Sequence, residues 1–289
     1  MKFYIVTPTY NSLRWLPMCV RSVADQVGQG IELHHHVQDG GSQDGLVEWL
    51  EAWKTAMSDV EGYTFTYESA ADDGMYDAIN KAWDIMPDDA GITAHLNSDE
   101  QYLPGALHAV AAQALMHAGT EVLLGTYIIA DAQNKYICHR RPVVPRAWSS
   151  WLNCACITNS AFYRADAFRR IRPRFDTKWR CVGDLVFFRE LTWQNVRFRT
   201  MPVITSLFVC TGSNLAWTSR AHEEWLSLHA DVPWLLRVCN GWIYRWVNFK
   251  RRVNDWFAAS PREYAAYATD CSERTLYRVS APTVAWNRK

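Results

Sequence analysis

The chain has 289 residues, of which 49% are hydrophobic and 21% are charged, a composition that excludes an intrinsically disordered protein. Thirty basic residues balance thirty acidic ones, so the basic surplus typical of nucleic-acid-binding proteins is missing and we expect no nucleic-acid partner. No stretch is apolar for long enough to cross a bilayer, and residues 1–6 lead into a predicted strand rather than a signal-peptide cleavage site, which predicts a cytoplasmic protein.

Strand and helix patterns alternate through the first hundred residues. Strands are predicted over residues 3–7, 31–37, 63–67 and 92–96, with helices between them over 13–23, 46–53 and 75–86. Strands that alternate with helices of ten or more residues indicate βαβ units. The sequence therefore predicts an α/β fold with a mostly parallel central sheet flanked by helices.

The pattern loosens after residue 100. Helices are predicted over residues 103–117 and 185–193, and strands over 121–130, 135–140 and 157–163. Near Trp217 the strand-like sequence ends and a Trp-rich tail with helical spacing begins. We therefore expect one domain over residues 1–215 and a helical C-terminal extension over residues 216–289.

Polar residues stand where three of the predicted strands end. Asp39 follows the second strand, Asp72 follows the third, and Asn97-Ser98-Asp99 follows the fourth. In an open α/β sheet, ligands bind beyond the carboxyl ends of the strands, so we expect these residues to share one site. An acidic site without a phosphate-cradling Gly-rich loop suits a divalent cation that holds a diphosphate, which is the chemistry of a nucleotide-sugar donor.

Motifs in a fixed order make the chain similar to family-2 glycosyltransferases. They are Thr7-Pro8-Thr9-Tyr10-Asn11, residues 39–45, residues 74–81 and residues 96–100, and the likeness continues through residues 158–163 and 183–185. The chain resembles the inverting enzymes of that family, which have the GT-A fold, over about residues 1–215. The resemblance implies a nucleotide-binding half over residues 1–100 and an acceptor half over 101–215. It also implies transfer from a UDP- or dTDP-sugar to a saccharide or lipid-linked saccharide, as in surface polysaccharide synthesis.

The same resemblance assigns a nucleotide-sugar-binding set, namely Thr7, Pro8, Thr9, Tyr10, Asp39, Asp72, Asn80, Asn97 and Ser98. Asp39 would accept a hydrogen bond from the imide N–H of uracil or thymine, a role that suits an ionised carboxylate. Asp72 and Asn80 would lie beside the ribose and diphosphate. Asp39 could instead only open a Gly-rich turn, in which Ser42 and Asp44 do turn and capping work.

Asn97-Ser98-Asp99 stands where the family carries its Asp-x-Asp motif. By that resemblance Asp99 would ligate Mg²⁺ or Mn²⁺, while Asn97 offers an uncharged amide oxygen. Asp184 matches the family's base position, where a carboxylate takes the proton of the acceptor hydroxyl. Two alternatives stay open, because Asp184 could be a helix N-cap and Asp176 could be the base.

Two other clusters have simpler interpretations. Alternation along a strand puts His35 on the opposite face from His34 and His36, so we assign the three histidines to the sheet rather than to a metal. Asp77 and Lys81 are four residues apart on a predicted helix and could form a surface ion pair. Residues 212–214 loosely resemble a family segment near the donor diphosphate.

The tail carries apolar residues at intervals of three and four. They are Leu235, Val238, Trp242, Trp246, Phe249, Val253 and Trp256, with Arg237, Arg251 and Arg252 towards the other side. A basic amphipathic helix with Trp at its boundary predicts peripheral contact with the inner face of the cell membrane through residues 235–257. The pattern equally fits a helix packed on the catalytic domain.

Two other functions use similar features. A sugar-phosphate nucleotidyltransferase shares this kind of sheet, but we would expect a Gly-rich, basic loop after its first strand, where this chain has Pro8-Thr9-Tyr10-Asn11. A non-catalytic saccharide-binding protein would fit the 15 Trp residues but would not need Asp99 together with Asp184.

Overall fold

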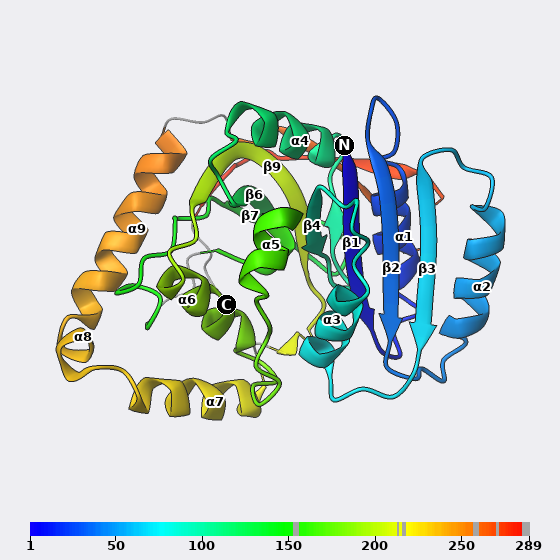
Figure 1. Cartoon of the computed structure of the whole chain (residues 1–289). Helices are drawn as coiled ribbons and strands as arrows, with labels where there is room; N and C mark the ends of the chain where they lie inside the picture. The colour runs from blue at the N-terminus through cyan, green and yellow to red at the C-terminus, as the bar shows by residue number, and fades with distance from the viewer. Residues whose placement is uncertain (153–155, 213, 216–217, 257–259, 270–271, 285–289) are drawn as a thin grey trace.

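The architecture comes from a computed structural model that describes residues 1–152, 156–212, 214–215, 218–256, 260–269 and 272–284, with the backbone alone for 254–256. In these residues nine strands form one mixed sheet in the order β3-β2-β1-β4-β8-β6-β9-β5, with β7 paired to β6. Helices cover both faces of the sheet (Figure 1). The predicted α/β fold with a central sheet flanked by helices is confirmed.

Four parallel strands form the first half of the sheet: β1 (Lys2–Thr9), β2 (Glu32–Asp39), β3 (Tyr63–Ser69) and β4 (Ile92–His95). Alternating side chains of β1 supply two cores. Phe3 and Ile5 pack with α1 (Leu16–Ala24) and α2 (Leu46–Ala56), and Tyr4 and Val6 pack with α3 (Met75–Asp84). In register, Thr9 lies opposite Asp39, and Asp39 lies opposite Ser69, so the carboxyl ends are level.

The second half of the sheet is mixed. Its elements are β5 (Gln101–Tyr102), α4 (Ala106–Met116), β6 (Val122–Asp131), β7 (Tyr136–Arg140), β8 (Ala161–Arg164), α5 (Ala165–Ile171), α6 (Gly183–Trp193) and β9 (Phe198–Cys210). Among the described strands of this half, β6 and β9 are the parallel pair, whereas β8 runs antiparallel to both β4 and β6. The mostly parallel sheet predicted from the sequence therefore holds only to residue 95. Periodicity defines which face a side chain takes, not the direction in which its strand is paired.

The C-terminal extension contains helices and a hairpin. Helix α7 (Ser219–Ala230) runs along the bottom of the molecule in Figure 1, and α8 (Trp234–Val238) and α9 (Asn240–Trp256) lie at the edge opposite α2. The chain then forms the antiparallel pair β10 (Glu263–Tyr267) and β11 (Arg274–Arg278), so the predicted helical extension is wrong for these two segments. The single helix predicted over 235–257 divides at Cys239, and residue 257 lies outside the described residues. None of the described helices is both long and apolar enough to cross a membrane.

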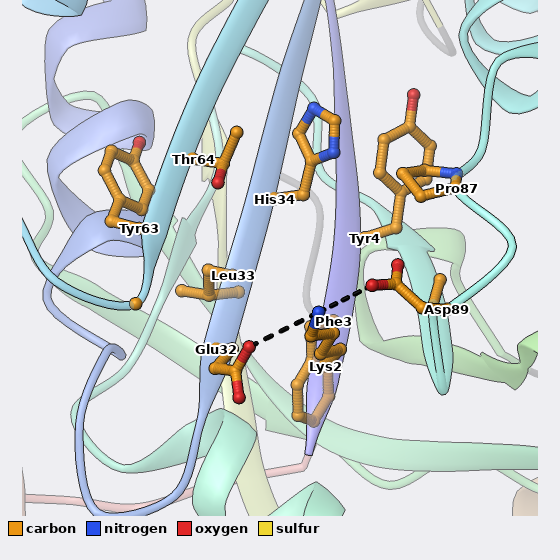
Figure 2. Close-up of a pocket in the computed structure, with 12 residues that line it drawn as sticks. Lys2, Phe3, Tyr4, Glu32, Leu33, His34, Tyr63, Thr64, Pro87 and Asp89 are labelled. Carbon is orange, nitrogen blue, oxygen red and sulfur yellow. Dashed lines mark hydrogen bonds and ion pairs between the residues drawn. The ribbon is translucent and has the colours of Figure 1, made fainter. Parts of the chain in front are cut away.

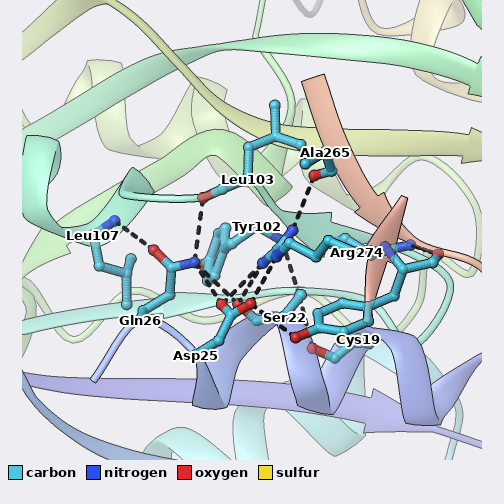
Figure 3. A network of polar contacts seen from close by, with 11 residues as sticks. Cys19, Ser22, Asp25, Gln26, Tyr102, Leu103, Leu107, Ala265 and Arg274 are labelled. Carbon is cyan, nitrogen blue, oxygen red and sulfur yellow. Dashed lines mark hydrogen bonds and ion pairs between the residues drawn. The ribbon is translucent and has the colours of Figure 1, made fainter. Parts of the chain in front are cut away.

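The hairpin is fastened to the end of α1. Arg274 donates to both carboxylate oxygens of Asp25, at 2.6 and 2.9 Å, and the Tyr267 hydroxyl donates to the same carboxylate at 3.0 Å (Figure 3). The side-chain amide of Gln101 pairs with both backbone polar groups of Tyr267, at 2.8 and 2.9 Å. These contacts join residues more than 160 positions apart, which explains why local sequence patterns do not predict them.

Candidate active site

The loops that follow β1 and β2 are interlocked at the carboxyl edge of the sheet. The backbone N–H of Asn11 donates to Ser42 Oγ at 2.7 Å, and the Asn11 side-chain oxygen accepts from the N–H of Gln43 at 2.9 Å. Asp44 accepts from the N–H of Leu13 at 2.8 Å. Asn11 has a φ of 45°, a left-handed conformation that Asn tolerates. The turn and capping work predicted for Ser42 and Asp44 is confirmed.

Asp39 is fully buried where these loops meet. Its carboxylate accepts from the N–H of Ser42 at 3.0 Å, from the Ser42 hydroxyl, and from the Ser69 hydroxyl at 2.6 Å. A carboxylate offers about four acceptor positions, so one is left for a ligand. The hydroxyl of Thr9, opposite Asp39 in register, is buried with no hydrogen-bond partner among the described residues. The turn role of Asp39 is therefore compatible with a ligand role.

The other predicted residues of β1 lie differently. Thr7 Oγ1 lies 2.9 Å from His35 Nε2 and 3.7 Å from Cys19 Sγ, inside the core against α1. The Thr7 side chain is thus used inside the core, and its role in nucleotide binding stays a prediction. Pro8 is buried within β1, and Tyr10 is 63% exposed just beyond the strand's end.

The three histidines belong to the sheet, as predicted. His34 Nε2 and His36 Nδ1 lie 2.8 and 2.9 Å from Thr66 Oγ1, and His35 contacts Thr7 on the opposite face. Burial lowers the pKa of His35 to about 3, so its ring is neutral. The described residues contain no group of three or more His, Cys, Asp or Glu side chains suited to a metal.

Asp72 lies against the turn that follows Asp39. Its Oδ1 accepts from the N–H of Gly74 at 2.7 Å, and a Cβ placed on Gly40 would come within 2.9 Å of its Oδ2. A Cβ on Gly74, which has a φ of +96°, would lie 2.5 Å from Arg180 Nη1. The start of α3 therefore touches both the β2 turn and the loop before α6.

Asn80 bridges α3 to that loop. Its amide donates to the Phe175 carbonyl at 2.9 Å and accepts from the Phe175 N–H at 3.0 Å, as a backbone group would. A direct contact between Asn80 and the nucleotide-sugar donor would have to use the amide hydrogen or the oxygen lone pair that Phe175 leaves free. Asp77 and Lys81 form the surface ion pair that their spacing allows, at 2.9 Å.

The turn that carries Asn97 and Ser98 is held by a buried carboxylate. Glu100 accepts from the backbone N–H of Asn97 at 3.0 Å and from the side chain of Asn159 at 2.9 Å. Asn159 accepts in turn from Ser206 at 3.2 Å. The side-chain oxygen of Asn97 is buried without a hydrogen-bond partner among the described residues. An unsatisfied buried oxygen is costly unless a ligand occupies it.

Asp99 is the carboxylate nearest in sequence to Asn97. Burial raises its pKa to about 6, because a low-dielectric environment disfavours the charged form. Asn214 donates to it at 3.4 Å from the segment 212–214, of which Ser213 lies outside the described residues. The Asp99 carboxylate and the side-chain oxygen of Asn97 fit a hard cation such as Mg²⁺ or Mn²⁺. Such a cation binds few protein groups and fills its other coordination positions with water or phosphate oxygens.

Asp184 lies in the first turn of α6. The N-cap position belongs to Val182, so the helix-cap alternative is wrong. Burial raises the pKa of Asp184, and its negative charge also contributes to the raised pKa of Glu100, after burial and the charge of Asp99. The carboxylates of Asp184, Glu100 and Asp99 therefore share one electrostatic environment. Asp176, the alternative base, is exposed in a turn.

Two residues that support Asp184 were not identified from the sequence. The Tyr76 hydroxyl accepts from the N–H of Asp184 at 3.3 Å. Glu224 of α7 accepts from the N–H groups of Arg180, Cys181 and Val182, at 2.8 to 3.3 Å. The only local signal at Glu224 is Arg220 four residues before it, which indicates a surface pair.

A cavity of about 360 Å³ lies at the opposite, amino ends of the strands (Figure 2). Lys2 lies between Asp89 and Glu32 there, at 2.6 and 3.6 Å, so its charge is already paired with two carboxylates. Eight-residue strands separate this cavity from the Asp39 edge by roughly 25 Å. None of the predicted site residues lines it.

A family model described as glycosyl transferase family 2 matches residues 4–189. No curated protein matches the chain. The fold is similar to crystal structures of S. aureus TarS. TarS 1–349 in complex with UDP-GlcNAc has 17% identity over 79% of this chain and 64% of that chain, with a TM-score of 0.59. The complex with UDP has 17% identity over 80% and 70%, with a TM-score of 0.55. TarS itself has 14% identity over 96% and 60%, with a TM-score of 0.58.

These identities are low enough that the likeness to TarS shows the fold alone. The chain spans 64% of the length of the first of these structures. The GT-A-like fold predicted from the motifs is confirmed.

Proposed function

The chain belongs to glycosyl transferase family 2, and from that premise we propose that it transfers a sugar from a UDP- or dTDP-sugar to a saccharide or lipid-linked saccharide, with inversion. Two of the TarS structures that share the fold contain UDP-GlcNAc or UDP, which supports a uridine nucleotide donor. We place the reaction in surface polysaccharide synthesis. The sugar-phosphate nucleotidyltransferase and the non-catalytic binding protein are set aside, because the family is one of glycosyltransferases.

The observation that carries the proposal is the shared environment of Asp99, Glu100 and Asp184. Asp99 follows β4 and Asp184 lies in the first turn of α6, yet the charges of both raise the pKa of Glu100. Both oxygens of Glu100 accept hydrogen bonds, from the Asn97 N–H and from Asn159. Asp99 accepts from Asn214 through one oxygen and Asp184 accepts from the Leu185 N–H through one oxygen, so each has a second oxygen that we assign to a ligand.

In the proposed reaction, Asp184 is the general base. The acceptor hydroxyl oxygen forms a bond to the anomeric carbon while the bond from that carbon to the diphosphate oxygen breaks. The proton of the hydroxyl moves to a carboxylate oxygen of Asp184, and the nucleoside diphosphate leaves with the bonding electrons. The raised pKa of Asp184 supports this role, because it brings the base closer to the operating pH.

Asp99 and Asn97 would hold Mg²⁺ or Mn²⁺. When bound, the cation neutralises charge on the departing diphosphate. Glu100 keeps the turn in place by accepting the Asn97 N–H, which leaves the Asn97 side-chain oxygen free to face a ligand. Ser98, between these two ligands, would contact the donor.

Asp39, Thr9 and Tyr10 would hold the nucleoside. Asp39 has one acceptor position left after Ser42 and Ser69, which supports a hydrogen bond from the imide N–H of the base. Asp72 would lie beside the ribose and diphosphate. For Asn80 we propose a positioning role, because its amide is paired with Phe175.

We also propose that the enzyme works in the cytoplasm. The six cysteines among the described residues are free thiols, which is usual in a reducing compartment.

The proposed function can be tested by nucleotide binding and by the stereochemistry of the product. We expect UDP to bind more tightly with Mn²⁺ than with chelator, and Asp99→Ala to remove that difference. The product should have the anomeric configuration opposite to the donor's. A product with retained configuration would contradict the proposal. So would an affinity for UDP that depends on neither the cation nor Asp99.

A further inference from the structure

We infer that α8 and α9 dock the enzyme on an anionic lipid surface. Five large apolar side chains on these helices are exposed: Trp234 by 69%, Leu235 by 58%, Val238 by 76%, Trp242 by 80% and Phe249 by 61%. Together with the cations beside them, Arg237, Arg245, Lys250 and Arg252, we call this set the aromatic–basic face. Neighbouring exposed aromatic side chains are unusual on a protein surface and mark a place of interaction.

The opposite side of α9 is already packed. Ile243 and Val247 are buried, in clusters with Leu152 and Val143 of the loop that follows β7. The helix is therefore anchored to the catalytic domain, as one sequence interpretation required. The aromatic–basic face is what remains exposed after that packing.

Aromatic and cationic side chains lie on the same side of α9. Trp242 and Phe249 are seven residues apart, so they differ by only about 20° around the helix axis. Arg245 and Arg252 follow them by three residues each, at about 60°. Sequence analysis placed Arg252 towards the opposite side from the apolar residues, and the exposure of Trp242, Phe249 and Arg252 together corrects that view.

The charge of this region favours lipid over a second protein copy. From Trp234 to Val253 the chain has five Lys or Arg residues and no Asp or Glu, although the whole chain has no net charge. Two copies meeting through this face would bring like charges together. An anionic headgroup layer would pair with the cations while the Trp and Phe rings enter the boundary with the acyl chains.

This inference deepens the proposed function, since a membrane surface is where a lipid-linked acceptor would be met. A physical connection runs from the face to the site. Helix α7 precedes α8 directly, and its Glu224 holds the backbone of residues 180–182 just before Asp184.

The test is flotation of the full chain with vesicles, without donor or acceptor. We expect binding to phosphatidylcholine vesicles that contain phosphatidylglycerol, and weaker binding to phosphatidylcholine alone. Trp242→Ala with Phe249→Ala should weaken binding by roughly 10- to 100-fold, because two large apolar side chains no longer enter the lipid. Arg245→Gln with Arg252→Gln should remove the preference for anionic lipid. Ile85→Ala with Leu276→Ala, which truncates apolar side chains exposed to a similar degree outside α8 and α9, should bind as the parent does.

Three results would overturn the inference. One is that the parent enzyme does not bind anionic vesicles. Another is that the variant with Trp242→Ala and Phe249→Ala binds them as the parent does. The third is a parent dimer that the same variant converts to a monomer, which would make a second copy the occupant. UDP binding, measured separately on each variant, should be unchanged; its absence from the parent would contradict the proposed function and leave the vesicle result standing.

Discussion

Residues 2–99 and the described part of residues 218–284 are held in place by different kinds of contact. In the first region the side chains extend from the ends of adjacent parallel strands, so one sheet edge aligns Thr9, Asp39 and Ser69. In the second region single side chains make long-range contacts. Glu224 reaches the loop before Asp184, and Arg274 reaches Asp25 at the end of α1.

The difference shows that the two regions should tolerate change differently. A strand-end residue is positioned by the whole sheet, so its substitution should alter chemistry or binding and leave the fold intact. A residue of the extension contributes through one contact, so its substitution should alter the position or stability of the part it holds.

The strongest test of the first region is Asp99→Ala. We expect transfer to fall by roughly 10³-fold or more, because the variant loses the charged ligand of the cation that neutralises the leaving diphosphate. Thermal unfolding should be close to the parent's. Asp89→Ala, at the opposite edge of the sheet, is the matched control and should retain full activity. If Asp99→Ala were as active as the parent in the presence of a chelator, the metal would have no part in the mechanism.

Asp184→Asn tests the residue where the two regions meet. Transfer should fall by ~10² to 10⁴-fold, as for a lost general base, while UDP binding stays unchanged because the amide has the same shape. If Asp184→Asn were as fast as the parent, Asp176 would be the next residue to test.

The pH dependence of Asp184 follows from its burial. Burial raises its pKa, so the ionised base is fully present above that raised value and is lost as pH falls through it. The rate of the parent at saturating Mn²⁺, which keeps Asp99 ionised, should therefore decline on the acidic side at a pH above the usual range for Asp. Asp184→Asn should lack that decline. An identical acidic limb in both enzymes would assign the limb to another group.

The sequence predicts the first region well because its rules are local. Alternation along β2 separates His35 from His34 and His36, and the strand ends place Asp39 and Asp99 at one edge. It fails to predict the contacts of Thr7 with His35 and Cys19 inside the core. It also fails for the hairpin at β10 and β11, where a five-residue alternation competes with the helical spacing that precedes it. Glu224 was missed because its partners lie more than 40 residues away.

Glu224→Gln tests whether the extension matters to catalysis. We expect kcat to fall by roughly tenfold with little change in donor KM, because the amide holds the N–H groups of residues 180–182 less firmly and Asp184 loses its alignment. Glu121→Gln is the matched control. Glu121 also accepts a backbone N–H, from Arg197 at 2.9 Å, and pairs with arginines, but outside the site. Glu121→Gln should lower stability and leave kcat unchanged. Equal losses of kcat in Glu121→Gln and Glu224→Gln would mean that Glu224 contributes to stability alone.

Asp39→Asn should have a smaller effect, confined to the donor. Asn keeps an oxygen for Ser42 and Ser69 but loses the charge that strengthens a hydrogen bond from the imide N–H. We expect donor KM to rise by about tenfold with kcat nearly unchanged, since the contact is remote from the reacting carbon. Steady-state kinetics with varied donor measures this. An unchanged donor KM would restrict Asp39 to its turn.

The smallest effect on catalysis is expected for Arg274→Met, which asks whether the hairpin belongs to the site or only to the fold. The Arg274 side chain is 11% exposed and donates twice to Asp25, so its loss should lower the free energy of unfolding by about 1–3 kcal/mol, as measured by denaturant titration. Turnover of the folded enzyme should not change, because Asp25 lies at the end of α1 away from the carboxyl edge. The hairpin does approach the site at one other place, where Tyr267 pairs with Gln101, the neighbour of Glu100. A fall in kcat as large as that of Glu224→Gln would show that this contact transmits the position of the hairpin to the Asn97–Asp99 turn, and both parts of the extension would then act on catalysis.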